Sequence, residues 1–244
     1  MKVKEKVVGI LGGMGPEATL DCFGKLIRNT AARKDQDHLR VIIDSNPKVP
    51  DRTAAILGQG DSPVPLLVAG AKALEKAGAD FIVVPCVSAH FFLDEVRALV
   101  NLPILSMLDV VAKAIQKDYP QIKIVGLMGT TGTIRGALFQ RRLKQSGIDT
   151  LVLEGEAQEK VMQAIYDIKD AQPSRTRGAI RADLISSAEA LVNRGAQGIV
   201  AGCTEIPLVL SQEHLTVPYF DSLLLLARAA IRHAGREPAK IARP

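Results

Sequence analysis

The sequence is poor in several residue types, and each shortage excludes a class of protein. It has no tryptophan, six phenylalanines, three tyrosines and three cysteines among 244 residues. With so few rings to stack on bases, single-stranded nucleic acid is not expected as a partner. Three cysteines are too few, and odd in number, for a disulfide framework, so we expect a reducing, cytoplasmic setting.

Long apolar runs are also missing. No stretch approaches the roughly 20 apolar residues that span a bilayer, so no membrane partner is expected. The first residues, MKVKEKVVGILGG, carry an apolar run shorter than a secretory signal requires. The sequence therefore predicts a protein that is neither exported nor inserted in a membrane.

An excess of one charge is nearly absent as well. The 31 basic and 26 acidic residues give a formal net charge of +5 and are interspersed along the chain. One modest basic cluster contains Arg135, Arg141, Arg142 and Lys144, and a solvated helix face explains it better than a nucleic-acid site. Hydrophobic residues make up 47% of the chain, which is typical of one large or two small globular domains.

Apolar, β-prone runs alternate with amphipathic helical patterns. The expected strands are Val7–Leu11, Val41–Ile43, Phe81–Pro85, Ile104–Met107, Ile122–Met128, Thr150–Leu153, Gly198–Ala201 and Val217–Phe220. The expected helices are Pro16–Arg33, Val64–Ala77, Val110–Lys117, Ile134–Gln145, Ala179–Arg194 and Ser222–Ala234. Continuous apolar strands separated by helices indicate parallel strands buried on both faces, hence a doubly wound α/β fold.

An internal repeat divides this α/β pattern into two halves. The motif that begins at Gly9 recurs 117 residues later at Gly126, and the same offset relates Ile82 to Ile199 and Cys86 to Cys203. Two separate segments that share one offset favour duplication of a single α/β unit. We therefore expect two pseudo-symmetric Rossmann-like domains, each with a parallel four-stranded sheet, formed by residues 1–105 plus 212–244 and by residues 106–211.

The two repeat-related cysteines follow the carboxyl ends of equivalent strands. Ligands of open parallel sheets bind at that edge. If the halves face one another, Cys86 and Cys203 would lie on opposite walls of one cleft, where a thiolate and a thiol can exchange protons with the two faces of a carbon atom. The hydroxyls of Ser88 and Thr204 could hold a carboxylate there. Cys22, in a helical pattern, is expected to be a small core residue.

Three other interpretations compete at these residues. The stretch Gly13–Ala18 fits G-x-G-x-x-A after a strand, and Asp44 sits near the end of the next strand, as a dinucleotide site would require. Cys86 and His90 have the i, i+4 spacing of two metal ligands, but no further cysteine or histidine pair completes a metal site, and His90 is better explained as a helix-cap or positioning residue. Glu205 could orient a substrate ammonium group or a thiol, or simply begin a helix.

Several motifs in order resemble those of the aspartate/glutamate racemase family, most closely its aspartate racemase branch. They are GILGGMGPEAT, NPKVPDRTAAIL, GADFIVVPCVSAH, GLMGTTGTI, VMQAIYDIK and GCTEIP. The resemblance implies racemisation of aspartate or glutamate without a cofactor, in a cleft between two domains, within a homodimer.

The resemblance also implies residue roles. Cys86 and Cys203 would be the opposed acid and base, and Arg52 with Thr53 would clamp the side-chain carboxylate of the substrate. Met14 and Thr130 match positions that line the pocket, and Lys169 matches a mobile lysine that closes over the substrate.

One position departs from the family pattern. PCVSAH replaces the usual PCNTAH, so Val87 stands where an asparagine helps to hold the substrate α-carboxylate, and Ser88 where threonine is usual. Losing a hydrogen bond to a charged group costs about 1.5–3 kcal/mol. Two alternatives to a racemase therefore stay open: a dicarboxylate isomerase or decarboxylase with one active thiol, and a weakly active or non-catalytic protein that binds acidic amino acids.

Overall fold

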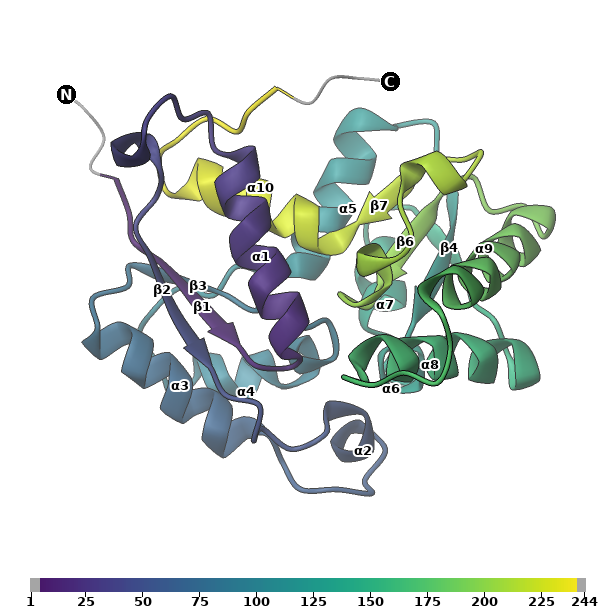
Figure 1. The fold of residues 1–244 in the computed structure, drawn as a ribbon, viewed down its shortest axis with the longest axis horizontal. Helices are drawn as coiled ribbons and strands as arrows, with labels where there is room; N and C mark the ends of the chain where they lie inside the picture. Colours follow the sequence, from purple (N-terminus) through teal and green to yellow (C-terminus); the bar gives the residue numbers. More distant parts are fainter. Residues whose placement is uncertain (1–4, 241–244) are drawn as a thin grey trace. The chain divides into compact units, whose positions relative to one another are not determined.

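The computed structural model describes residues 5–240, which form two compact units (Figure 1). The described part of the first unit comprises residues 5–50, 62–107 and 223–240, and the second comprises 51–61 and 108–222. Each unit has its own parallel sheet flanked by helices. The predicted α/β class is confirmed.

The first sheet has three parallel strands in the order β2-β1-β3. They are β1 (Val8–Gly12), β2 (Val41–Ser45) and β3 (Phe81–Val83). Every residue of β1 and β3 is buried. Helices α1 (Pro16–Asn29) and α3 (Val64–Lys76) cover opposite faces, because an added Cβ at Gly12 would meet Thr19 of α1, whereas one at Gly9 would meet Leu74 of α3.

The expectation of four strands in this sheet is wrong. The segment expected as a fourth strand makes only an isolated parallel bridge, between Ile104 and Ile82. Ile82 donates its N–H to Pro103 and accepts from Leu105. Pro103 has no N–H to continue the ladder, and helix α5 (Met107–Asp118) begins three residues after Ile104. The remaining elements of this unit are η1 (Asp35–Asp37), η2 (Ser88–Phe92), α4 (Leu93–Arg97) and α10 (Ser222–His233).

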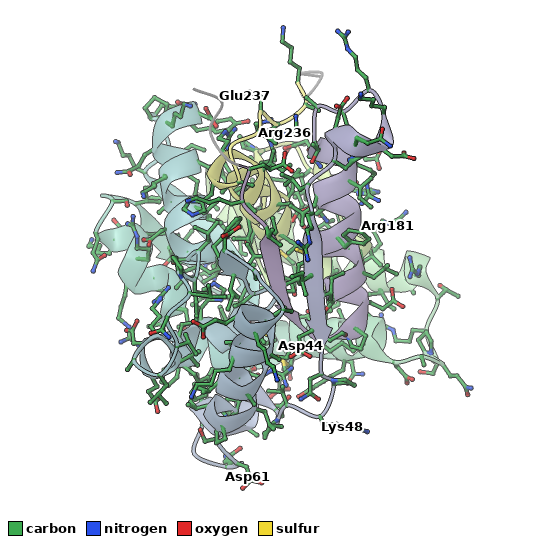
Figure 2. The ribbon with its side chains drawn as sticks, turned by 90° about the vertical axis from the view of Figure 1, so that its left-hand side faces the viewer. Asp44, Lys48, Asp61, Arg181, Arg236 and Glu237 are labelled. Carbon is green, nitrogen blue, oxygen red and sulfur yellow. The ribbon has the colours of Figure 1, made fainter. Side chains whose placement is uncertain are left out.

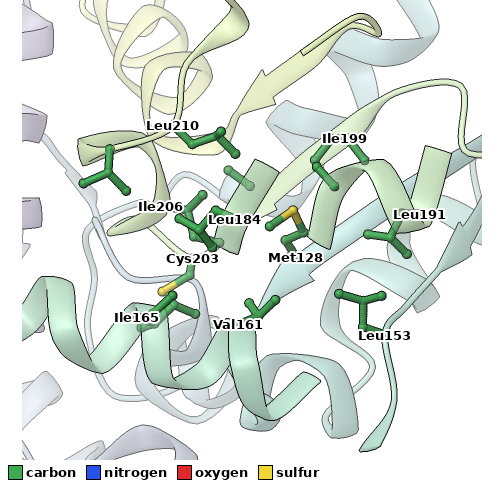
Figure 3. Close-up of a cluster of buried hydrophobic side chains, with 14 of the residues drawn as sticks. Met128, Leu153, Val161, Ile165, Leu184, Leu191, Ile199, Cys203, Ile206 and Leu210 are labelled. Atoms are coloured by element: carbon green, nitrogen blue, oxygen red, sulfur yellow. The ribbon is translucent and has the colours of Figure 1, made fainter. Parts of the chain in front are cut away.

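The second sheet has four parallel strands in the order β5-β4-β6-β7. They are β4 (Ile124–Gly129), β5 (Asp149–Leu151), β6 (Ile199–Gly202) and β7 (Tyr219–Asp221). The other elements are α2 (Arg52–Ile56), most of α5, α6 (Thr131–Arg135), α7 (Leu138–Lys144), α8 (Gly155–Lys169), α9 (Arg177–Asn193), η3 (Ile206–Leu208) and η4 (Gln212–His214). Helices α8 and α9 pack with β4 and β6 around a buried apolar core (Figure 3).

The sheet register supports the duplication read from the sequence. In the first unit Gly9 pairs with Ile82, and in the second Gly126 pairs with Ile199. Both members of each pair are shifted by the same 117 positions, and β1 and β4 each lie between the equivalent neighbouring strands. The two sheets therefore share strand order and register in their common core.

The units differ from the expected domain boundaries in three places, of which the smallest is that residues 106–107 belong to the first unit. Residues 212–222 belong to the second unit because β7 pairs with β6. Residues 51–61 also belong there: α2 packs on α6 so closely that a Cβ at Gly132 would come within 2.8 Å of Thr53 Cα. The sequence pattern could not assign either segment, since each joins its unit through contacts made far along the chain.

The helix expected over 134–145 is two helices. Helix α6 ends at Arg135 and α7 begins at Leu138, and between them Ala137 has a left-handed φ of 52°. Three side chains of the basic cluster bind other residues of the chain. Arg142 pairs with Asp109, Lys144 pairs with Asp149, and Arg141 donates to the carbonyl of Gly136. These contacts agree with the interpretation of the cluster as a solvated helix face.

Candidate active site

Cys86 lies just beyond the carboxyl end of β3, in the first unit. Its residue surface is 4% exposed, and its Sγ lies 3.5 Å from the Oγ of Ser88. Because β1 and β3 are parallel neighbours, the turn after β1 reaches the same edge of the sheet. That turn carries Met14, which is also buried.

The turn before α1 is built around a glycine that no other residue replaces easily. Gly13 has a φ of 91°, and its added Cβ would lie 2.3 Å from the backbone of Asn46. The N–H of Gly13 donates to the Thr19 hydroxyl at 2.8 Å, and that hydroxyl donates to the Gly15 carbonyl at 2.9 Å. These contacts fix the backbone on both sides of Met14.

His90 holds the backbone of Cys86 rather than its sulfur. The His90 Nδ1 lies 2.9 Å from the Cys86 carbonyl oxygen, and its Nε2 lies 3.0 Å from the backbone nitrogen of Met107. A carbonyl oxygen only accepts, so Nδ1 carries the hydrogen and Nε2 accepts from the Met107 N–H. Both ring nitrogens are thus engaged in the neutral tautomer, which suits a positioning residue and not a metal ligand.

Val87 and Ser88 complete this edge of the first unit. Val87 is 2% exposed and precedes η2, which begins with the buried Ser88. The structure thus brings Met14, Cys86, Val87 and Ser88, all predicted from the sequence, to the carboxyl edge of one sheet.

Cys203 occupies the equivalent position in the second unit, just beyond β6. Its Sγ donates a hydrogen bond to Oε2 of Glu205 at 2.9 Å, and the Thr204 hydroxyl lies 3.3 Å from the same oxygen. The other oxygen of Glu205 pairs with Nζ of Lys169 at 3.1 Å. Figure 3 shows the Cys203 sulfur directed toward Ile165 of α8, the helix that ends at Lys169.

Burial raises the pKa of Cys203 well above its usual range. Loss of solvation is the largest cause, the negative charge of Glu205 adds to it, and Lys169 opposes it. A thiol is therefore the favoured form at this position in the absence of substrate.

Arg52 and Thr53 lie at the start of α2, beside the turn that carries Thr130. The carboxylate of Asp51 caps α2 by accepting from the Ala54 N–H at 2.7 Å. Thr130 caps α6 in the same way, accepting from the Thr133 N–H at 3.1 Å. Because Thr53 lies against Gly132, the two caps are neighbours in the second unit.

Two side chains whose polar groups are buried, Gln158 and Tyr219, escaped the sequence analysis. Gln158 of α8 donates to the carbonyl of Gly129, immediately before Thr130, at 2.9 Å. Tyr219 of β7 packs against the core cluster that contains Cys203, and burial, followed by the charge of Asp221, raises the pKa of its hydroxyl. A glutamine in a helix and a tyrosine in a strand are common, so neither carried a local signal.

The dinucleotide and metal alternatives gain no support. The Asp44 carboxylate, labelled in Figure 2, lies against α3: a Cβ added to Gly70 would approach its Oδ2 to 2.3 Å. This contact favours a packing role for the acidic residue that a dinucleotide site would need for ribose. Within residues 5–240, no cluster of three or more histidine, cysteine or acidic side chains is arranged to hold a metal ion.

Comparisons with known proteins identify the family of this chain. The model of the family described as Asp/Glu/Hydantoin racemase matches residues 11–230. The broad specificity amino-acid racemase RacX of Bacillus subtilis is 29% identical over 231 residues, which are 92% of this chain and 96% of that protein.

Solved structures are similar over the same length. An aspartate racemase from Picrophilus torridus has a TM-score of 0.85 at 31% identity, with 96% of both chains covered. An aspartate racemase homologue from Pyrococcus horikoshii has a TM-score of 0.73 at 28% identity, covering 95% of this chain and all of that one.

Among residues 5–240, no helix has the length and apolar character needed to cross a membrane. With a family model that matches nearly the whole sequence and two duplicated α/β units, the chain belongs to the Asp/Glu/Hydantoin racemase family.

Proposed function

We propose that the protein is a cofactor-independent racemase that interconverts L- and D-aspartate, or the enantiomers of glutamate. The observation that carries this proposal is the placement of Cys86 and Cys203 at equivalent strand ends of two units that share strand order and register. Each of the two duplicated units provides one cysteine. Racemisation requires one proton-transfer group on each face of the α-carbon, which a pair of equivalent cysteines can provide. The named racemases among its relatives support the same chemistry.

The proposed chemistry uses one thiolate and one thiol. The thiolate takes the α-proton from one face, breaking the Cα–H bond, and the thiol delivers its proton to the opposite face. The α-hydrogen of an amino acid is a very weak acid, so the intermediate carbanion requires aimed N–H groups and positive charge in a site poor in water. The roles of the two sulfurs exchange when the other enantiomer is bound.

The remaining predicted residues are proposed to bind the substrate. Arg52 and Thr53 would hold the side-chain carboxylate, because a guanidinium group matches a carboxylate in a bidentate manner. The hydroxyls of Ser88 and Thr204 would approach the α-carboxylate, beside Val87. Further residues proposed at the pocket are Met14, Thr130, Lys169 and Glu205.

Incubation in heavy water tests this function directly. We expect L- and D-aspartate, or L- and D-glutamate, each to incorporate deuterium at the α-carbon and to lose optical activity, as followed by proton NMR and chiral chromatography. Carbon dioxide release would instead identify a decarboxylase. Stoichiometric binding of an acidic amino acid without exchange from either enantiomer would refute the racemase proposal.

A wider substrate range is the second candidate, and Val87 favours it. This buried, apolar residue stands in place of a polar one, and the Bacillus subtilis relative is named for broad specificity. The substrate panel therefore includes non-acidic amino acids. If Val87 only weakens binding of the α-carboxylate, Val87→Asn should raise kcat/KM by about ten- to a hundredfold across all active substrates, since the lost hydrogen bond is worth about 1.5–3 kcal/mol. An unchanged kcat/KM would exclude that role.

We also propose a homodimer. Helix α1 leaves Leu20 and Ile27 exposed, at 64% and 42%, and Ile43 on the neighbouring edge strand β2 is 40% exposed. Exposed apolar side chains are typical of an interface where they form one patch, and the proposal places these three in such a patch. We expect a mass in solution of twice 26.2 kDa. Leu20→Glu should lower this mass toward that of the monomer. A monomer at all concentrations would refute it.

A further inference from the structure

The surroundings of the two sulfurs are chemically different, although their positions in the fold are equivalent. Cys203 donates to a carboxylate oxygen of Glu205 at 2.9 Å. Cys86 lies 3.5 Å from the hydroxyl of Ser88, a group that can donate a hydrogen bond to a thiolate. The carboxylate accepts and cannot donate, so it stabilises only the protonated form of its sulfur.

The carboxylate of Glu205 is well placed for this task. Its side chain is 3% exposed, one oxygen receives the Cys203 and Thr204 hydrogen bonds, and the other pairs with Lys169. The ammonium group of Lys169 pairs with this buried carboxylate and offsets part of its negative charge. Lys169 thus contacts the group that binds the Cys203 thiol, a contact that the sequence alone did not predict.

The other ionisable groups around Cys203 do not reverse this effect. Tyr219, on β7, interacts electrostatically with Cys203, and Asp221 follows it on the same strand. A neutral phenol and a carboxylate add no positive charge. Lys169 is the one cation that acts on the Cys203 charge in the part of the chain the structure describes, and its effect is outweighed by burial and Glu205.

Resting on the proposed racemase function, we propose that the two sulfurs are not equivalent in the resting protein. The hydrogen bond to Glu205 holds Cys203 as the proton donor, against the opposing charge of Lys169, and Cys86 is then the proton acceptor of that function. The enantiomer whose α-proton faces Cys86 then reacts directly. Its Cα–H bond breaks, the proton passes to the Cys86 sulfur, and the Cys203 S–H proton passes to carbon. Afterwards Cys203 regains a proton from water while Cys86 releases one, which restores the resting form.

Activity alone cannot reveal this asymmetry. The two enantiomers have equal free energy, so kcat/KM is the same in both directions at every pH whatever the resting form. The asymmetry has to be measured on the sulfurs themselves. The pH dependence of alkylation reports the thiolate fraction, and its midpoint does not depend on how accessible each sulfur is.

The test is alkylation of the intact protein by iodoacetamide over a range of pH, without substrate, with each cysteine followed by peptide mass spectrometry. In the unmodified protein we expect the midpoint for Cys86 to lie at lower pH than that for Cys203. Glu205→Gln should lower the Cys203 midpoint, and its labelling at neutral pH should rise about tenfold for every pH unit by which that midpoint falls. Lys169→Gln should move the midpoint in the opposite direction, because a positive charge is lost.

A packing defect would shift the alkylation midpoint of Cys203 in the same direction in both variants. Shifts in opposite directions therefore indicate electrostatic control. Glu189→Gln, on the exposed face of α9 in the same unit, is the matched control and should leave both midpoints unchanged. Lys169 is partly exposed, so its variant keeps the test usable if Glu205→Gln fails to fold. Equal midpoints for the two cysteines, or changes of one sign, would overturn the proposal. Because no substrate is present, this result is independent of the heavy-water experiment.

Discussion

Replacing either Cys86 or Cys203 by alanine should lower kcat/KM for racemisation by a factor of about 10²–10⁴, the usual contribution of a positioned proton-transfer group. Cys22→Ala, the same substitution at a fully buried residue of α1, should leave kcat/KM within a few-fold. Chiral chromatography of the product from each enantiomer measures the effect. The three variants together separate the loss of a reactive thiol from the loss of a buried sulfur.

Deuterium exchange distinguishes the two active-site variants further. A protein that keeps only one of the thiols can still remove the α-proton from the enantiomer that faces it, and can return deuterium to the same face. We therefore expect each single variant to retain some exchange, without inversion, for one enantiomer, and the two variants to prefer opposite enantiomers. Full racemisation by either variant would contradict the two-thiol mechanism.

Much of the fold could be predicted because its signals are local or periodic. Buried strands such as Val8–Gly12 are continuous apolar runs, and the repeat of 117 residues reappears as a shared register. The predictions were wrong where contacts between distant parts of the chain determine the structure. The segment at Ile104 pairs too briefly to form a strand, and residues 51–61 join the second unit through the contact of Thr53 with Gly132.

In the candidate site, too, some features could be predicted from the sequence and others depend on tertiary contacts. The strand ends of Cys86 and Cys203 follow from the repeat, since equivalent strands end at equivalent places. The contact of Lys169 with Glu205 joins residues 36 positions apart, and no sequence period connects a helix end to a loop after a strand. The burial of Tyr219 beside the Cys203 core depends on β7 joining the second sheet, which the expected domain boundary had excluded.

Arg52→Ala should lower kcat/KM for aspartate by about ten- to a hundredfold, because a hydrogen bond to a charged group contributes about 1.5–3 kcal/mol. Arg52→Lys should restore only part of the loss, since an ammonium group cannot engage both carboxylate oxygens in the planar manner of a guanidinium. Steady-state kinetics with both enantiomers measures the change.

Arg52 is half-buried on α2, which packs against α6, so its removal could also loosen the turn that carries Thr130. A substrate without a side-chain carboxylate separates the two effects. If Arg52 binds that carboxylate, Arg52→Ala should lower kcat/KM for aspartate and leave kcat/KM unchanged for a substrate of the panel that lacks a side-chain carboxylate, such as alanine. The ratio of kcat/KM between the two substrates then becomes smaller. Equal losses with aspartate and alanine would assign Arg52 to packing, and another residue would then have to select the acidic side chain.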